Sequence, residues 1–179
     1  MSRKWNGARK ERVRNLSFTK GKQYSCVLDL PGAPCLSIKN LLNNNAIHSK
    51  TQFVVIDREA SEMQAVQNRF RLWQLHDRSQ FITDDVANCH LNGKAFDWVN
   101  LDTCSSFSWG IARFVSRINF INNGELNVWL ATFRGNKRFA DGLCHTFINT
   151  KDGLSVAHSL ISSERRSMID KCNNLTMRN

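Results

Sequence analysis

Two apolar segments that each end in an aspartate constrain the fold of this chain more than any other feature. The first is Tyr24–Leu28, which is followed by Asp29 and a short loop, Leu30–Pro34, with a single glycine. The second is Thr51–Ile56, which is followed by Asp57. Continuous apolar runs of this length are typical of strands that are buried on both faces of a parallel sheet. With an amphipathic stretch between them, they predict the start of an α/β domain.

The alternation of apolar strands and amphipathic helices continues toward the C-terminus. Further strands are expected at Gln80–Thr83, Ala95–Leu101 and Leu126–Phe133. Asn122-Asn123-Gly124 is typical of a helix end, because glycine tolerates the left-handed conformation of a C-terminal cap. Helices are expected at Ser37–Asn45, Ala60–His76, Ser108–Ile121, Phe139–Ile148 and Leu154–Lys171.

Five strands that alternate with helices predict a doubly wound, mostly parallel sheet with strand order 3-2-1-4-5. Residues 136–179 are interpreted as mainly helical. Either this end of the chain contains a reduced hairpin of short strands, or the sheet edge is open or covered by a protein partner.

Aspartates occur at the ends of four of the five expected strands. They are Asp29, Asp57, the pair Asp84-Asp85, and Asp102. One such acid would be an ordinary turn former or helix cap. Because the carboxyl ends of parallel strands meet at one edge of the sheet, the whole set is expected to form a carboxylate rim. Like charges repel one another in a crevice without a cation, so the rim predicts a ligand site there.

The first 22 residues carry most of the positive charge. They hold eight Lys and Arg residues and one acid, a net charge of +7 within a total of +10. Such an arm is typical of a segment that binds nucleic-acid phosphates, and also of a solubilising tail. We divide the chain into this basic arm, 1–22, and a single domain, 23–179. The candidate nucleic-acid contacts are Arg9, Lys10, Arg12, Arg14, Lys20 and Lys22 in the arm, and Arg134, Lys137 and Arg138 in a turn.

Cysteine and histidine usage argues against a metal or disulfide framework. The six cysteines contain no C-x-x-C pair, and the five histidines form no ligand pattern. This spacing indicates free thiols in a reducing compartment. No apolar run approaches the roughly 20 residues that a membrane helix needs. We therefore expect a cytoplasmic protein with no membrane association and no metal.

On these motifs the chain resembles the class I S-adenosylmethionine-dependent methyltransferases, over about residues 24–135. The acid and glycine-containing loop after the first strand match here as Val27-Leu28-Asp29-Leu30-Pro31-Gly32-Ala33-Pro34. The resemblance implies a Rossmann-like fold and S-adenosylmethionine as cofactor, with Asp57 at the ribose and Asp84 or Asp85 at the adenine. A sulfonium cation suits a carboxylate rim better than a pyrophosphate does. The implied cofactor-binding residues are Asp29, Pro31, Gly32, Ala33, Asp57, Arg58, Asp84 and Asp85.

The resemblance also implies that the segment after the fourth strand, Asp102-Thr103-Cys104-Ser105, holds the methyl acceptor. Asp102 and Cys104 are the catalytic candidates. Cys104 is either a thiolate nucleophile that adds to a base, as in cytosine-C5 methyltransferases, or a small packing residue.

Two function hypotheses follow, and a third is weaker. The first is an enzyme that methylates nucleic acid, RNA or DNA. The alternative is a catalytically degenerate methyltransferase fold that binds nucleic acid or a protein partner without turnover. The third is an enzyme that uses or binds the same cofactor in other chemistry.

Overall fold

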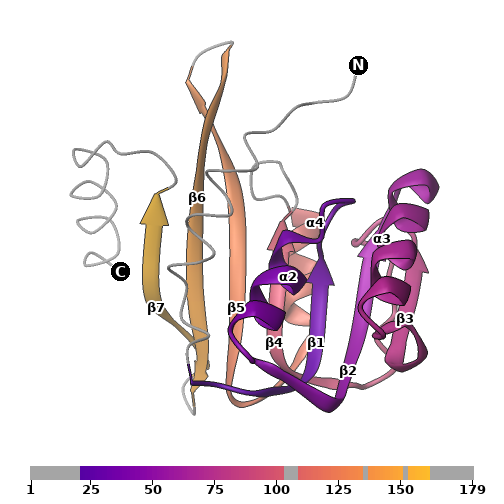
Figure 1. Cartoon of the computed structure of the whole chain (residues 1–179). Coiled ribbons are helices and arrows are strands. Elements are labelled where there is room, and N and C mark those ends of the chain that lie inside the picture. Colours follow the sequence, from indigo (N-terminus) through magenta and orange to yellow (C-terminus); the bar gives the residue numbers. More distant parts are fainter. Residues whose placement is uncertain (1–20, 103–108, 135–136, 151–152, 162–179) are drawn as a thin grey trace.

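The computed structural model describes residues 21–102, 109–134, 137–150 and 153–161, and the basic arm before residue 21 lies outside them. One sheet runs through the described part, and helices pack on both of its faces (Figure 1). The elements are, in chain order, β1 (Tyr24–Leu30), α2 (Leu36–Asn43), β2 (Ile47–Asp57), α3 (Ala60–Leu72), the 3₁₀ turn η1 (His76–Arg78), β3 (Ser79–Thr83), β4 (Ala95–Asp102), α4 (Trp109–Ser116), β5 (Asn119–Arg134), β6 (Lys137–Thr150) and β7 (Gly153–Ile161).

The strands lie in the order β3-β2-β1-β4-β5-β6-β7. The first five are parallel to one another, which confirms the doubly wound sheet and its predicted order 3-2-1-4-5. The last two strands are antiparallel additions. The chain reverses its direction of winding at β1, which lies between β2 and β4, so a ligand crevice is expected at the carboxyl end of β1.

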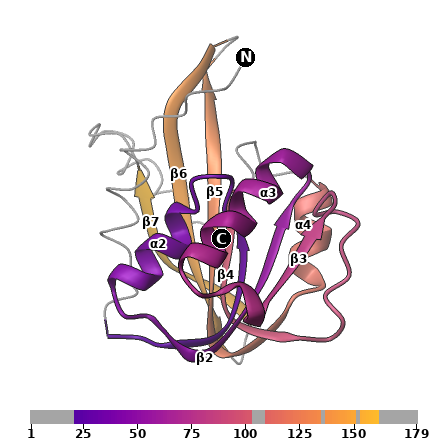
Figure 2. The same ribbon diagram turned by 45° about the vertical axis from the view of Figure 1, so that its right-hand side comes forward.

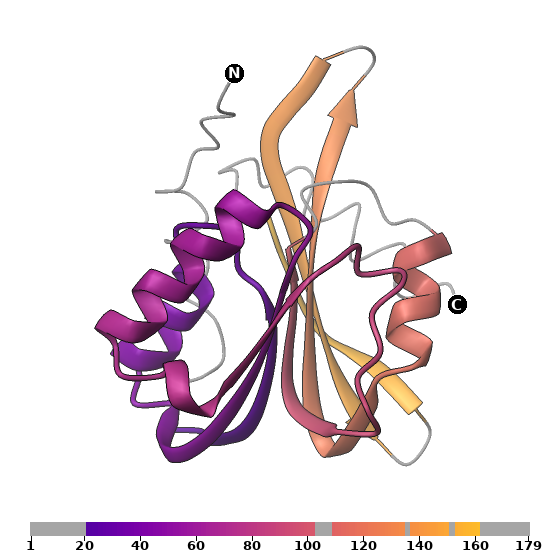
Figure 3. The ribbon, with the colours of Figure 1, turned by 90° about the vertical axis from the view of Figure 1, so that its right-hand side faces the viewer.

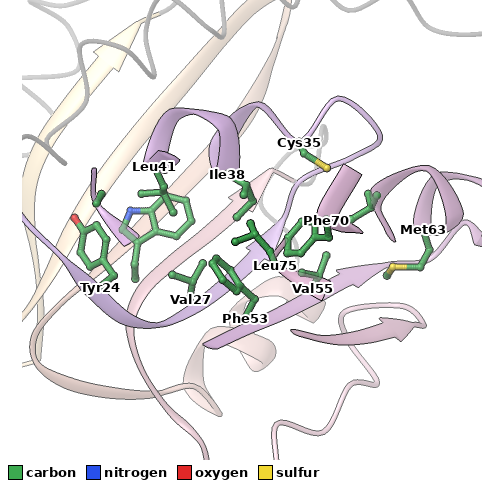
Figure 4. Close-up of a cluster of buried hydrophobic side chains, with 13 residues drawn as sticks. Tyr24, Val27, Cys35, Ile38, Leu41, Phe53, Val55, Met63, Phe70 and Leu75 are labelled. Atoms are coloured by element: carbon green, nitrogen blue, oxygen red, sulfur yellow. The ribbon is translucent and has the colours of Figure 1, made fainter. Parts of the chain in front are cut away.

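The helices form two layers, one on each side of the sheet. Figure 3 shows α2 and α3 on one face and α4 on the other. Because neighbouring side chains of a strand point to opposite faces, β1 supplies Val27 to the core under α2 and α3, and Leu28 to the core under α4. Figure 4 shows the first of these cores, in which Phe53 packs edge-on against Phe70 of α3.

The C-terminal helices that the sequence suggested are wrong. The region Phe139–Ile148 lies in strand β6, and the first part of Leu154–Lys171 lies in strand β7. Apolar residues spaced four apart suggested a helix, but four is also a multiple of the strand period of two. Leu154, Val156 and Leu160 keep to that period of two, a strand pattern that the sequence reading missed. β6 pairs with β5 and β7 pairs with β6, and this pairing favours the strand over the helix in both segments.

The expected helix end at Asn122-Asn123-Gly124 is also wrong, because α4 ends at Ser116 and these residues lie within β5, where its pairing with β4 is irregular. On β4, the paired residues on either side of the irregularity are Phe96 and Trp98, two positions apart. Their partners on β5, Phe120 and Glu125, are five positions apart, so β5 contains extra residues there. Asn123 takes a φ of 62°, and a Cβ on Gly124 would lie 2.9 Å from the Phe96 carbonyl oxygen. The glycine is therefore needed for close approach of two strands rather than for a helix cap.

The hairpin of β5 and β6 rises well beyond the other strands at the carboxyl edge of the sheet, as Figures 1 and 2 show from two directions. In the part of the chain that the structure describes, no helix combines the length and the apolar character that crossing a membrane would require.

Candidate cofactor site

Asp29 lies within β1, near its carboxyl end, and is fully buried. Ser37 of α2 donates a hydrogen bond from its Oγ to Asp29 Oδ2 at 2.5 Å. Asn100 of β4 donates one from its Nδ2 to Asp29 Oδ1 at 2.7 Å. Burying a carboxylate is costly unless donors satisfy its oxygens, and these two do so. Asp29 thereby ties the beginning of α2 and the end of β4 to β1, directly below the predicted cofactor loop.

The loop after β1 owes its sharp path to two residues in the left-handed region. Gly32 has a φ of 60° and Cys35 a φ of 47°. The backbone N–H of Cys35 donates to the Gly32 carbonyl at 3.0 Å, which closes a turn. Cys35 stands at the N-cap of α2 without a side-chain cap bond, so the first N–H groups of α2 can serve a ligand.

The thiol of Cys35 is not a nucleophile candidate. Burial, with a further contribution from the negative charge of Asp29, raises its pKa to about 12. The thiolate form is therefore scarce near neutral pH, and the side chain serves as packing in the core under α2.

Two charged residues of α3 hold the loop by its backbone. Ala33 donates its N–H to Glu62 Oε2 at 2.9 Å, and the Ala33 carbonyl accepts a hydrogen bond from Arg69 Nε at 2.7 Å. Glu62 and Arg69 are seven residues apart in the sequence, which places them on the same face of the helix. Both backbone groups of Ala33 are engaged by α3, and the Gly32 carbonyl is engaged by Cys35. The Gly32 N–H and the Pro31 carbonyl are therefore the backbone groups of the loop that are better placed to approach a ligand, since proline has no N–H.

Asp57 ends β2 beside this loop and is half-buried. Burial raises the pKa of Asp57 above its usual value. The backbone N–H of Glu59, which donates to Asp57 Oδ1 at 2.9 Å, lowers the pKa, while the charges of Glu62 and Glu59 raise it. A partly desolvated carboxylate among like charges is stabilised by a cation or by hydroxyl donors.

The loops after β2 and β3 meet at the rim. The backbone N–H of Asp84 donates to the Asp57 carbonyl at 3.2 Å. Asp84 and Asp85 are exposed, and their side chains accept backbone N–H bonds from Asp85 and Ala87 within the turn. Both acids therefore also act as turn formers. Arg58 is exposed and pairs with Glu59 at 3.2 Å, so it lies on the surface beside Asp57.

Of the other predicted site residues, Asp102 lies at the rim, and the rest lie elsewhere in the fold or outside the described residues. Asp102 ends β4 at the same edge of the sheet and is half-buried. Cys104 and the arm residues Arg9, Lys10, Arg12, Arg14 and Lys20 lie outside the described residues. Lys22, which precedes β1, forms an ion pair with the buried Glu125, which pairs with Trp98 in the middle of β4, away from the rim. Arg134, Lys137 and Arg138 are at the far end of the β5–β6 hairpin.

Four residues that organise this edge were missed by sequence reasoning, and only one of them gave a usable signal. Asn100 is a polar residue in the otherwise apolar end of β4, a pattern that indicates a buried hydrogen bond. Ser37, Glu62 and Arg69 contact residues that are distant in the sequence. Serine and charged residues are common on helices, so no local pattern distinguishes these three. Among the described residues, no group of three or more His, Cys, Asp or Glu side chains is arranged to hold a metal.

The strand order and the switch point at β1 define a Rossmann-like fold, and solved structures of methyltransferases share it. A proposed rRNA methylase from Clostridium thermocellum superposes with a TM-score of 0.54 and 13% identity, over 78% of this chain and 75% of that one. An O-methyltransferase family protein from Burkholderia thailandensis gives 0.52 and 15%, over 73% and 39%. The [4+2]-cyclase SpnF gives 0.51 and 17%, over 70% and 45%.

These likenesses establish the fold. The chain spans less than half the length of SpnF and of the Burkholderia protein. No protein-family model and no curated protein matches the sequence. The solved structures include a cyclase beside the methylases, so the chemistry has to be argued from the site itself.

Proposed function

We propose that this chain is an S-adenosylmethionine-dependent methyltransferase that acts on nucleic acid. The observation that carries the proposal is the half-buried Asp57 at the end of β2, beside a backbone loop that α3 holds in place. A ribose diol offers two hydroxyl donors to such a carboxylate, and a sulfonium cation gains from the surrounding negative charge. An anionic ligand such as a pyrophosphate would be repelled there.

The residues present fit this cofactor at several points. Asp57 would accept the ribose hydroxyls, and the exposed acids Asp84 and Asp85 stand where the adenine end would lie. The backbone of Pro31 and Gly32 and the uncapped start of α2 would serve the amino-acid end. When bound, S-adenosylmethionine supplies an activated methyl group. The protein has mainly to hold an acceptor in line with that group, so few side chains need special reactivity.

On the acceptor side, Asp102 is the described candidate. Its position at the end of β4, across the switch point from the loop, puts a half-buried carboxylate at the edge where the acceptor would enter. Such a carboxylate can orient an acceptor or take a proton from it. Nucleic acid is proposed as the acceptor because the chain is strongly basic, with charge gathered in the arm and at the hairpin.

The test is a methyl-transfer assay with isotope-labelled S-adenosylmethionine and the full chain, using total RNA, genomic DNA and protein as separate acceptors. We expect label in nucleic acid, a large loss in Asp57→Ala, and wild-type transfer in Asp77→Ala, a control acid in the exposed turn η1. Asp102→Asn and Cys104→Ala then separate a carboxylate from a thiolate as the catalytic group. Label in protein alone would contradict the nucleic-acid part of the proposal.

A second function is favoured by one observation. Both backbone groups of Ala33 are engaged by α3, and the loop has a single glycine, so fewer backbone donors remain for a cofactor than a glycine-rich loop offers. This favours a binding protein of methyltransferase fold that has no turnover. Tight nucleic-acid binding without any S-adenosylmethionine binding would establish that alternative.

A further inference from the structure

We propose that the projecting end of the β5–β6 hairpin is a contact surface for the phosphate backbone of nucleic acid. This inference rests on the proposed function, since it names the part of the molecule that would hold the substrate beside the candidate cofactor site. Two features support it, namely the length of the projection and its charge.

The projection extends from the edge of the sheet at which the rim lies. The last paired residue of β4, Asp102, stands opposite Trp129, and β5 continues from there to Arg134. At about 3.4 Å for each residue of a strand, these five further residues reach roughly 17 Å beyond the end of β4. Because β5 is parallel to β4, the extension points the same way as the carboxyl ends that carry Asp57 and Asp102. Figures 1 and 2 show the hairpin standing clear of the other strands on that side.

Among the residues that the structure describes, the projecting part is a two-stranded ribbon, and residues 162–179, which follow β7, lie outside them. Pairing between β6 and β7 stops at Leu143 and Ile161. Beyond it, the pairs Ala131 with Gly142 and Arg134 with Lys137 join only β5 and β6 among the strands that the structure describes. An isolated two-stranded hairpin is marginally stable in water. A partner surface that lay against this end of the hairpin would add to its stability.

The charge of the ribbon indicates which surface that is. Three of the four residues in its last two pairs are basic, namely Arg134, Lys137 and Arg138. Arg134 and Lys137 are direct partners, and like charges directly opposite each other weaken a strand pair. Basic residues gathered on one short segment are typical of contacts with phosphate groups, whose condensed counterions are released on binding. A polyanion is therefore the favoured occupant.

The same geometry explains how an acidic rim could serve a polyanionic substrate. The carboxylates that suit a sulfonium cation would repel phosphates at the edge itself. With the basic residues of the ribbon displaced from that edge, the backbone of the nucleic acid could be held at the ribbon while a single nucleotide reaches the rim. The acidic rim would thus face the target nucleotide, and the basic ribbon would face the phosphate backbone of the same substrate.

The experiment compares two charge-neutralised variants of the full chain. The ribbon variant is Arg134→Gln with Lys137→Gln and Arg138→Gln. The matched control is Lys50→Gln with Arg71→Gln and Arg113→Gln, which removes the same charge at exposed positions elsewhere. The dissociation constant for a single-stranded RNA, and for a DNA of the same sequence, is measured over a range of salt concentrations. Titration with S-adenosylmethionine and thermal unfolding accompany each variant.

We expect the ribbon variant to lose about 2 to 3 from the slope of log affinity against log salt, and the control to keep the wild-type slope. Equal slopes in ribbon variant and wild type, equal losses in both variants, or no nucleic-acid binding by the wild type would each overturn the inference. Failure of the wild type to bind S-adenosylmethionine contradicts the proposed function, while the salt slopes still decide the role of the ribbon.

Discussion

Asn100 and Asp29 stand directly opposite each other on neighbouring parallel strands, and the Asn100 side-chain amide donates a 2.7 Å hydrogen bond to the Asp29 carboxylate. The pair is buried at the point where the sheet reverses its winding. Through Ser37, the same carboxylate also fixes the start of α2. The candidate cofactor loop is thus supported from below by a polar contact in the middle of an apolar core.

Replacing Asn100 with leucine should leave Asp29 Oδ1 without that donor in a buried site. A buried charged group that loses a partner costs about 3 kcal/mol of the free energy of unfolding. Chemical denaturation measures this loss. Asn68→Ala, an exposed asparagine on α3, is the control and should change stability by less than about 0.5 kcal/mol. A loss below about 1 kcal/mol for Asn100→Leu would show that the pair contributes little.

The contacts of Glu62 and Arg69 with Ala33 predict an effect on cofactor affinity. Each single change to alanine removes one hydrogen bond to the loop and should weaken S-adenosylmethionine binding about 5- to 10-fold, with little change in thermal stability because both side chains are at the surface. Arg71→Ala, also on α3, is the control. Charge alone predicts the opposite for Arg69, since removal of a cation would favour a sulfonium ligand. Stronger binding by Arg69→Ala would therefore contradict the positioning role.

Asp57 should show the trade-off between stability and function that is typical of a binding site. Its folded-state pKa is raised, chiefly by burial, so ionisation of this group opposes folding at pH 7. Asp57→Asn should be at least as stable as the wild type at pH 7. That advantage should shrink once the pH falls below the raised pKa, and it should vanish below the usual pKa of an aspartate, where the carboxyl is protonated in both the folded and the unfolded chain. Denaturation at pH 7 and at a pH below the usual pKa of an aspartate tests this. A clear loss of stability in Asp57→Asn at pH 7 would contradict it.

Gly124 permits the close approach of β4 and β5 near the irregularity in β5. A methyl group there would meet the Phe96 carbonyl oxygen at 2.9 Å, a backbone atom that cannot move without shifting the strand. We expect Gly124→Ala to lower the free energy of unfolding by about 1 to 3 kcal/mol. The neighbouring Asn122→Ala, at an exposed position, should be nearly neutral. Similar values for the two variants would show that the irregularity in β5 adapts freely.

The sequence was sufficient where a structural element depends on its own residues. The apolar runs that became β1, β2 and β4 supply buried side chains to both faces of the sheet, which suits a sheet that is covered on both sides. Their terminal acids fall on one edge because the strands are parallel. The sequence was not sufficient where the secondary structure of a segment depends on the strand with which it pairs. Phe139, Leu143 and Phe147 are spaced so as to fit a helix or a strand, and contact with β5 selects the strand.

The candidate site shows the same division. Asp57 could be predicted because it follows a strand directly. The hold of Glu62 and Arg69 on Ala33 could not, because it joins residues that are far apart in the sequence and charged residues at that spacing are common on exposed helix faces. The projection of β5 and β6 depends on the lengths of two strands relative to β4, which no local pattern encodes.

The most direct test of the account is calorimetric titration of S-adenosylmethionine into the wild-type chain and into Asp57→Ala, with Asp77→Ala as the control. We predict saturable binding by the wild type and by the control. Loss of the hydrogen bonds to a charged group should weaken Asp57→Ala at least about tenfold. No binding heat with the wild type would contradict the assignment of this edge as a sulfonium-nucleoside site, and undiminished affinity in Asp57→Ala would contradict the role of Asp57.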